Sequence, residues 1–270
     1  MNLSVHPHHR RHLRPAVRRV LTVTVVACIA VGGASFVLHS RSAVPAASAT
    51  STSSASAASE AESSLLTARQ AQAILDDPRM VLVNHTNKMP DDHTFTTKAC
   101  GSATAVNKTL QTEAADAFLA MQAAAAKDGV TIWMQSGYRS VSYQTNLYEK
   151  KTNYYKQQGY DDAKAKEMAA AIVNPPGYSE HNCGLAADLN SPEHTGLDEG
   201  FENTAAFRWL CQHAGEYGFI LRYPKGAEEK TEITYEPWHW RYVGVENAAK
   251  INASGLCFED YIAALQQIAG

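Results

Sequence analysis

The centre of the chain reads SEHNCGLAADL, residues 179–189, in which a histidine precedes a short run that alternates as a β-strand does. Alternation places Asp188 on one face of this strand and Ala187 and Leu189 on the other. A carboxylate with such apolar neighbours must be paired, hydrogen-bonded or bound to a metal if it is buried. Taken alone, the stretch leaves two interpretations open: a metal site that includes His181, or a satisfied aspartate beside a surface histidine.

A second motif reads YEPWHWRYVG over residues 235–244 and combines a glutamate, a proline and a histidine. The aromatic side chains that follow the proline share one strand face, which is typical of core packing, whereas His239 falls on the opposite face. Packing therefore does not explain His239. Regular strand geometry would put Glu236 and His239 on opposite faces, so the chain must turn or bulge near Pro237 if both serve one site.

Two histidines and an aspartate form a known type of catalytic zinc site, with three protein ligands and a fourth position for water. We expect His181, Asp188 and His239 to be these ligands, and zinc lowers the pKa of such a water to about 7. Glu236 beside the metal would take the proton and later return it to the leaving amine. A glycosidase with paired glutamates is a poorer interpretation, because it leaves both histidines without a role.

A third motif, SGYRS over residues 136–140, lies between a predicted strand and a predicted helix. An arginine in this position is usually a surface residue. Its functional interpretation is a guanidinium fork that binds a carboxylate in bidentate geometry, which lysine cannot copy. Gln144 follows one turn into the helix and would point the same way as Arg139.

Together and in this order, the three motifs resemble those of the metallo-D-alanyl-D-alanine carboxypeptidases, the group related to the vancomycin-resistance carboxypeptidases and dipeptidases. The resemblance covers roughly residues 80–265. It implies one Zn²⁺ per chain on the three ligands above, Glu236 as the general base, and Arg139 polarising the scissile carbonyl or binding the substrate carboxylate. It also implies substrate contacts from Ser179 and Gln144.

The resemblance further implies removal of the terminal D-Ala from peptidoglycan stem peptides that end in D-Ala-D-Ala. Alternatives with the same zinc site are a peptidoglycan endopeptidase and a D,D-dipeptidase. A rival from another class is a non-catalytic zinc domain that binds wall peptides, against which Glu236 argues. We expect the protein to act as a monomer.

Composition and patterning predict the fold class. Hydrophobic residues make up 45% of the 270 residues and charged residues 19%, which suits a globular domain with a real core. Helical and strand patterns alternate irregularly, which predicts an α+β domain with a small central antiparallel sheet flanked by helices. Helices are expected over residues 65–77, 109–128, 140–158, 162–172, 204–217, 245–252 and 258–268, and strands over 80–83, 130–135, 185–189 and 238–243.

The N-terminal part has a different character. Residues 1–20 are rich in arginine and contain no acid, and residues 21–38 are apolar or small and uncharged. A helix of that length rises about 27 Å, close to the roughly 30 Å of a bilayer core. We therefore expect a basic cytoplasmic segment and a signal anchor, with everything that follows outside the cell membrane. Cleavage of the signal and secretion is the alternative, since residues 47–49 resemble a cleavage site.

Residues 39–64 are almost all Ala, Ser and Thr, which predicts a flexible linker to a single domain over residues 65–270. In an exported domain, Cys100, Cys183, Cys211 and Cys257 are an even set in a compartment where disulfides persist. We expect the pairs Cys183–Cys211 and Cys100–Cys257. The formal net charge of −3 gives no basic footprint, so nucleic acid is not an expected partner.

Overall fold

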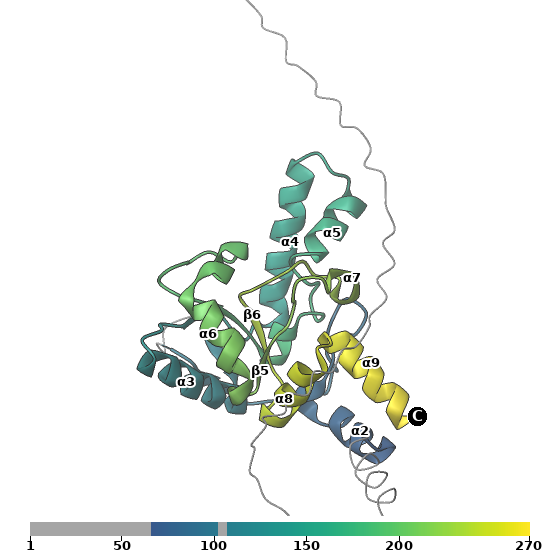
Figure 1. The fold of residues 1–270 in the computed structure, drawn as a ribbon. Coiled ribbons are helices and arrows are strands. Elements are labelled where there is room, and N and C mark those ends of the chain that lie inside the picture. Colours follow the sequence, from purple (N-terminus) through teal and green to yellow (C-terminus); the bar gives the residue numbers. More distant parts are fainter. Residues whose placement is uncertain (1–65, 102–106) are drawn as a thin grey trace, which may run out of the picture. The chain divides into compact units, whose positions relative to one another are not determined.

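The computed structural model describes residues 66–101 and 107–270 of the chain. Its main sheet has four strands in the order β3 (Trp133–Ser136), β4 (Ala186–Asn190), β6 (His239–Tyr242) and β5 (Phe219–Leu221). Each neighbouring pair in this sheet is antiparallel. Helices surround the sheet (Figure 1), so the predicted α+β class with a small antiparallel sheet is confirmed.

Most of the described helices follow the predicted ranges. They are α2 (Ala68–Leu75), α3 (Thr112–Lys127), α4 (Val141–Gln157), α5 (Asp162–Ala170), α6 (Ala205–His213), α7 (Glu228–Thr231), α8 (Val245–Ser254) and α9 (Phe258–Ala269). Shorter 3-10 turns cover Pro78–Met80, Glu180–Cys183, Glu199–Asn203 and Ala214–Tyr217. The hairpin of α4 and α5 stands beside the sheet as a separate pair (Figure 1).

The two faces of the sheet have different roles. On one face, Leu189 and Trp240 pack in a large apolar core with Phe118 of α3 and Leu210 of α6. On the other face, Asp188 and its cross-strand partner His239 present polar side chains. A second apolar cluster at the β5 end joins the sheet to α2, α8 and α9. Alternation in β4 and β6 therefore sends apolar side chains into the main core and the chemical groups to the opposite face.

A small two-stranded sheet supports the loops around the polar face. It pairs β1 (Thr97–Ala99) with β2 (Thr109–Gln111) in antiparallel register. The backbone carbonyl of Thr109 accepts a hydrogen bond from the Tyr138 N–H at 2.6 Å, and the Gln111 N–H donates to the Gly184 carbonyl at 2.8 Å. The loop after β3, which contains Tyr138, and the segment after His181, which contains Gly184, are therefore both hydrogen-bonded to strand β2.

Three sequence-based expectations for secondary structure are wrong in detail. The strand expected over residues 80–83 is absent, because Asp77 caps a 3-10 turn that begins at Pro78, although Val83 is still buried in the core. The helix expected from Thr109 begins at Thr112, since the three preceding residues pair with β1. The helix expected over residues 204–217 is capped by Thr204 and changes to a 3-10 turn after His213.

The expected disulfides are not formed among the described residues, where Cys100, Cys183, Cys211 and Cys257 are all free thiols. Cys183 is fully buried in the main core, whereas Cys211 is exposed on α6. Burial raises the pKa of the Cys183 thiol to about 12, so this side chain packs as a neutral apolar group.

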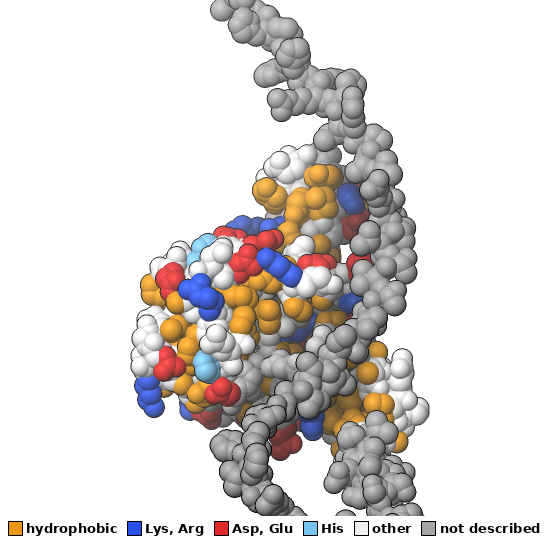
Figure 2. Space-filling model, viewed as in Figure 1, with side chains coloured by type: hydrophobic (Ala, Val, Ile, Leu, Met, Phe, Trp, Pro, Cys, Tyr) orange, Lys and Arg blue, Asp and Glu red, His pale blue; other side chains and the backbone are white. Residues whose placement is uncertain are grey.

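The predicted cytoplasmic segment, signal anchor and linker, residues 1–64, all lie outside the described residues. Within residues 66–101 and 107–270, no helix combines the length and the apolar character needed to span a bilayer. Figure 2 shows acidic and basic side chains interspersed over the face that it draws rather than gathered into a basic patch.

Candidate active site

Asp188 lies at the centre of the polar face of the sheet. In the β4–β6 pairing its Cα is the partner of His239, and in the β3–β4 pairing it is the partner of Ser136. Residues directly opposite each other on antiparallel strands project their side chains from the same face. The register therefore brings the aspartate of one motif and the histidine of another together, although 51 positions of sequence order separate residues 188 and 239.

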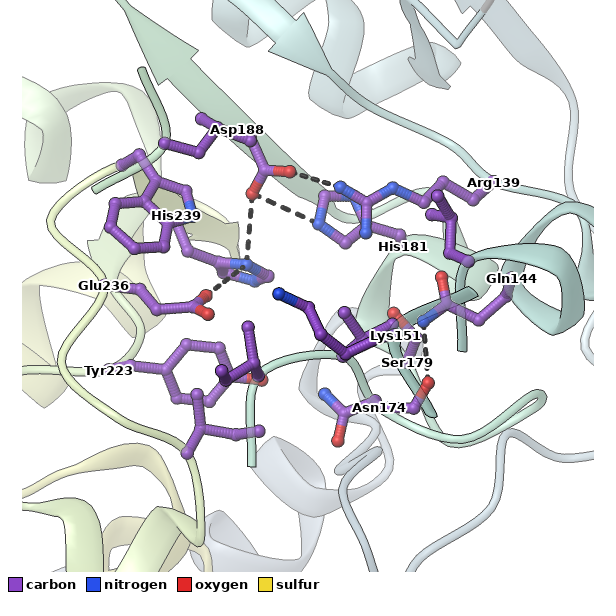
Figure 3. A pocket seen from close by; sticks show the side chains of 16 residues that line it. Arg139, Gln144, Lys151, Asn174, Ser179, His181, Asp188, Tyr223, Glu236 and His239 are labelled. Carbon is purple, nitrogen blue, oxygen red and sulfur yellow. Dashed lines mark hydrogen bonds and ion pairs between the residues drawn. The ribbon is translucent and has the colours of Figure 1, made fainter. Parts of the chain in front are cut away.

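The three predicted metal ligands converge on one point (Figure 3). Oδ1 of Asp188 lies 3.3 Å from Nε2 of His181 and 3.3 Å from Nδ1 of His239. One nitrogen or oxygen atom from each residue falls within 4.8 Å of the others, and all three residues are buried. The structure thus brings together the three residues that the sequence proposed as ligands.

A backbone contact fixes the orientation of His181. Its Nδ1 lies 2.7 Å from the carbonyl oxygen of Gly137, and because a carbonyl only accepts, Nδ1 carries the proton. The lone pair of Nε2 is then available on the side of Asp188. Burial lowers the pKa of His181 to about 4, so the ring is neutral. A Cβ on residue 137 would lie 2.3 Å from the Thr109 carbonyl oxygen, so the close approach of these two backbone segments requires glycine at Gly137.

The two oxygens of Asp188 have different surroundings. Oδ2 accepts a hydrogen bond and ion pair from Nη2 of Arg139, whereas Oδ1 is buried with no hydrogen-bond partner. A buried carboxylate oxygen without a partner is costly unless a cation meets it. Two imidazoles and a carboxylate are also a donor set that Zn²⁺ prefers, so the residues present fit a zinc ion.

A turn solves the geometric difficulty posed by Glu236. Strand β6 begins only at His239, and the His239 N–H donates to the Glu236 carbonyl at 3.2 Å across Pro237 and Trp238. The chain therefore turns where the sequence required it to turn. Oε2 of Glu236 lies 3.5 Å from Nδ1 of His239, on the metal-facing side of the ring.

The protein groups alone set unusual proton affinities at this site. Burial raises the pKa of Glu236 to about 8, and the nearby Asp188 charge acts in the same direction. Burial alone would lower the pKa of His239, but the adjacent carboxylates of Asp188 and Glu180 outweigh it and raise the value to about 9. A carboxyl group with a pKa near neutrality is suited to accept and return a proton during turnover.

The remaining predicted site residues line the same cavity of about 300 Å³. Arg139 approaches from the loop after β3, and its Nε donates to Ser136 Oγ at 2.9 Å. Gln144 is buried on α4, where one N–H of its Nε2 donates to the Asn174 carbonyl at 2.7 Å and its Oε1 has no hydrogen-bond partner. Ser179 is buried just before the 3-10 turn that carries His181.

Three residues at the site were not predicted from the sequence: Tyr223 and Lys151, which line the cavity, and Glu180, which lies behind it. The Tyr223 ring centroid lies 4.8 Å from that of His239, and its hydroxyl is buried without a hydrogen-bond partner. Tyr223 follows β5, a three-residue strand whose pattern is too short to predict. Only a correct prediction of this strand could have indicated that Tyr223 lies near the site.

Comparison with known proteins finds relatives that cover the described domain. The model of the VanY family, described as D-alanyl-D-alanine carboxypeptidase, matches residues 107–245. A D-alanyl-D-alanine carboxypeptidase of Enterococcus faecalis is 32% identical over 264 residues, which are 94% of each chain.

Two solved structures of peptidases are also similar to this chain. The crystal structure of a mutant of the vancomycin-resistance D,D-pentapeptidase VanY in complex with Zn(II) is 34% identical, with a TM-score of 0.59 over 68% of this chain and 99% of that one. The structure of the L,D-carboxypeptidase LdcB is 34% identical, with a TM-score of 0.59 over 70% of this chain and 88% of that one. From the family match and the near full-length relative together, this chain belongs to the VanY family of D-alanyl-D-alanine carboxypeptidases.

Proposed function

We propose that the chain is a zinc-dependent carboxypeptidase that removes the terminal D-Ala from peptidoglycan stem peptides ending in D-Ala-D-Ala. One observation carries this proposal: the unpartnered Oδ1 of buried Asp188 lies between two histidine nitrogens, with Glu236 beside them. His181, Asp188 and His239 would hold a single Zn²⁺. When bound, zinc polarises a carbonyl oxygen and lowers the pKa of water, so that a nucleophile is available at neutral pH.

Glu236 is the residue that moves the proton. Its carboxylate accepts a proton from the attacking water and returns it to the amine of the departing D-alanine. Burial of the side chain shifts the pKa of Glu236 upward, which helps the carboxyl group hold that proton between the two steps. A strongly acidic carboxylate would hold it less well.

Arg139 and Tyr223 would contribute to the reaction in different ways. Arg139 neutralises the second oxygen of Asp188 and thereby fixes the carboxylate in the orientation that exposes Oδ1. Tyr223 holds a hydroxyl with no protein partner at the cavity wall. A partnerless donor aimed at a substrate site is suited to stabilise negative charge that develops on the scissile carbonyl oxygen.

We also propose that the domain works on the outer side of the cell membrane. The uncharged segment over residues 21–38 would anchor the chain, and the Ala/Ser/Thr-rich residues 39–64 would tether the domain near wall-attached or lipid-linked stems. Protease added to intact cells should then release the domain. If all of the protein were instead found in the culture medium, shortened at its N-terminus, that result would support cleavage of the signal.

The substrate proposal is tested with the detergent-solubilised full chain, a pentapeptide stem and the matching tetrapeptide stem, with and without a metal chelator. We expect loss of one alanine from the pentapeptide, no reaction of the tetrapeptide and no reaction in chelator, read by mass spectrometry. Cleavage of free D-Ala-D-Ala, assayed in parallel, without reaction of the pentapeptide supports a D,D-dipeptidase, and an internal cut of the pentapeptide supports an endopeptidase.

The tetrapeptide serves as a control because LdcB, an L,D-carboxypeptidase, is as similar in fold as the D,D-pentapeptidase. Loss of one alanine from the tetrapeptide alone would therefore replace the D,D assignment with an L,D one. Zinc binding without cleavage of either peptide would support the non-catalytic wall-binding domain.

A further inference from the structure

A carboxypeptidase must distinguish the end of a peptide from its interior, and the terminal carboxylate is the chemical difference. In an extended peptide this carboxylate lies about one residue, roughly 3.5 Å, beyond the scissile carbonyl. A cationic side chain that lines the cavity near the proposed metal site would recognise it. The inference below rests on the proposed function and concerns the residue that provides this cation.

Two permanently cationic side chains line the cavity, Arg139 and Lys151. The guanidinium of Arg139 already forms an ion pair with Asp188 through Nη2 and donates to Ser136 through Nε. Most of its charge is therefore balanced by the protein. In the described part of the chain Lys151 forms no ion pair, whereas Lys156 and Lys166 on the same helical hairpin both pair with Asp162.

Helix α4 directs Lys151 into the cavity. Gln144, Leu147 and Lys151 have the i, i+3 and i+7 spacing of one helix face, and all three line the cavity. Two turns separate Gln144 from Lys151, about 10 Å along the helix axis. Figure 3 shows the Lys151 side chain reaching into the cavity, with its ammonium end toward the side where His239 and Glu236 lie.

The other polar groups on this wall are less suited to a carboxylate. Gln144 carries no charge; one N–H of its Nε2 donates to the Asn174 carbonyl, and its buried Oε1 is an acceptor that would repel a carboxylate. Ser179 offers a hydroxyl but no charge. Lys151 is only partly buried, and its Nζ lies 5.7 Å from the centroid of the Tyr154 ring, so the group is accessible to a ligand.

We propose that Lys151 binds the terminal carboxylate of the substrate and is the specificity-determining residue for cleavage at the peptide end. A hydrogen-bonded ion pair of this kind contributes about 10- to 100-fold to binding. The contribution should appear in KM rather than in kcat, because the contact is present in both the bound substrate and the transition state.

The experiment compares the zinc-loaded full chain with its Lys151→Gln, Lys151→Arg and Lys150→Gln variants. Lys150 is the matched control, since it is the adjacent lysine on α4 but faces a different groove. Each protein is assayed on a pentapeptide with a free terminal carboxylate and on the same peptide with a terminal carboxamide. Loss of D-Ala by the unaltered chain on the free acid tests the proposed function separately.

We expect the unaltered chain and Lys150→Gln to prefer the free acid by about 10- to 100-fold in kcat/KM. Lys151→Gln should lose this preference through a raised KM for the acid and an unchanged value for the amide, and Lys151→Arg should retain most of it. Preference retained in Lys151→Gln overturns the proposal, as does an equal loss on both peptides. Calorimetric binding of both peptides in a Glu236→Gln background gives the same comparison without turnover.

The same assay separates the terminal carboxylate from one elsewhere in the peptide. A third peptide keeps its free terminus but has its internal carboxylates converted to amides. If Lys151→Gln changes the response to this internal amidation and not to amidation of the terminus, the lysine reads the interior of the stem and the proposal is wrong.

Discussion

Oε2 of Glu180 lies 3.6 Å from Nε2 of His239, and both atoms are buried without a hydrogen-bond partner. Nε2 is the ring nitrogen remote from Asp188, so Glu180 stands behind the imidazole as seen from the proposed metal site. Its other oxygen accepts 2.7 Å hydrogen bonds from both Arg222 and Arg241. A carboxylate behind a metal-binding histidine fixes the ring orientation and tautomer.

Replacing Glu180 by Gln should weaken zinc binding about 10- to 100-fold, because the ring loses its charged partner. Competition with a chromophoric chelator measures this affinity. Glu259→Gln is the matched control, since Glu259 also pairs with buried Arg222 but makes no contact with His239. Both variants should be less stable, so affinity is compared well below their melting temperatures. Equal zinc affinity of the two variants would show that Glu180 has no role in orienting His239.

Replacing Tyr223 by Phe should lower kcat by about 10- to 100-fold and leave the melting temperature unchanged or higher. The hydroxyl is buried without a partner, so the folded protein gains no hydrogen bond from it. Its removal therefore costs no stability, whereas a substrate would lose a donor. Steady-state kinetics and thermal unfolding of the same sample test this. A fall in melting temperature with normal kcat would assign Tyr223 a structural role instead.

The metal-free protein should lose stability as pH rises from 6.5 to 9. Glu236, with its pKa raised to about 8, keeps a proton in the folded state that the unfolded chain has already released, so rising pH favours unfolding. His239 acts in the same direction, since its pKa rises from 6.5 to about 9 and the stability it contributes below 6.5 is lost as pH passes 9.

Thermal unfolding of the chelator-treated protein across this pH range measures the effect. Glu236→Gln should flatten the dependence, because the amide does not titrate. Added zinc should raise the melting temperature more at pH 9 than at pH 6.5, since zinc competes with protons for the ligands. A melting temperature that is constant or rises with pH in the metal-free protein would contradict these proton affinities.

Much of the site could be predicted because alternation in β4 and β6 is simple. The period of two put Asp188 and His239 on the face opposite the core, and the sheet register placed them opposite each other. Pro237 also indicated that the chain must turn beside Glu236, as it does. The roles of these residues as ligands and base stay predictions, to be tested by the experiments above.

Other features depend on long-range packing that no local pattern reports. Strand β5 is only three residues long, so nothing in the sequence distinguished Tyr223 from an ordinary tyrosine in a surface loop. Glu180 looked like an ordinary acid beside a histidine, because the two arginines that bury it come 42 and 61 positions later. In the apolar run over residues 80–83, Met80 and Val83 are buried without strand pairing, so here hydrophobicity indicated burial but not a strand.

The most direct test of the central claim is to measure zinc content and release of D-Ala on one preparation of the Glu236→Gln variant. The amide is nearly isosteric with the carboxylate and leaves His181, Asp188 and His239 in place, so we predict a full complement of zinc. Release of D-Ala from the pentapeptide should fall by at least about 10²- to 10⁴-fold, because no general base remains. Turnover near that of the unaltered chain, with zinc bound, would contradict the assignment of Glu236 and with it the proposed mechanism.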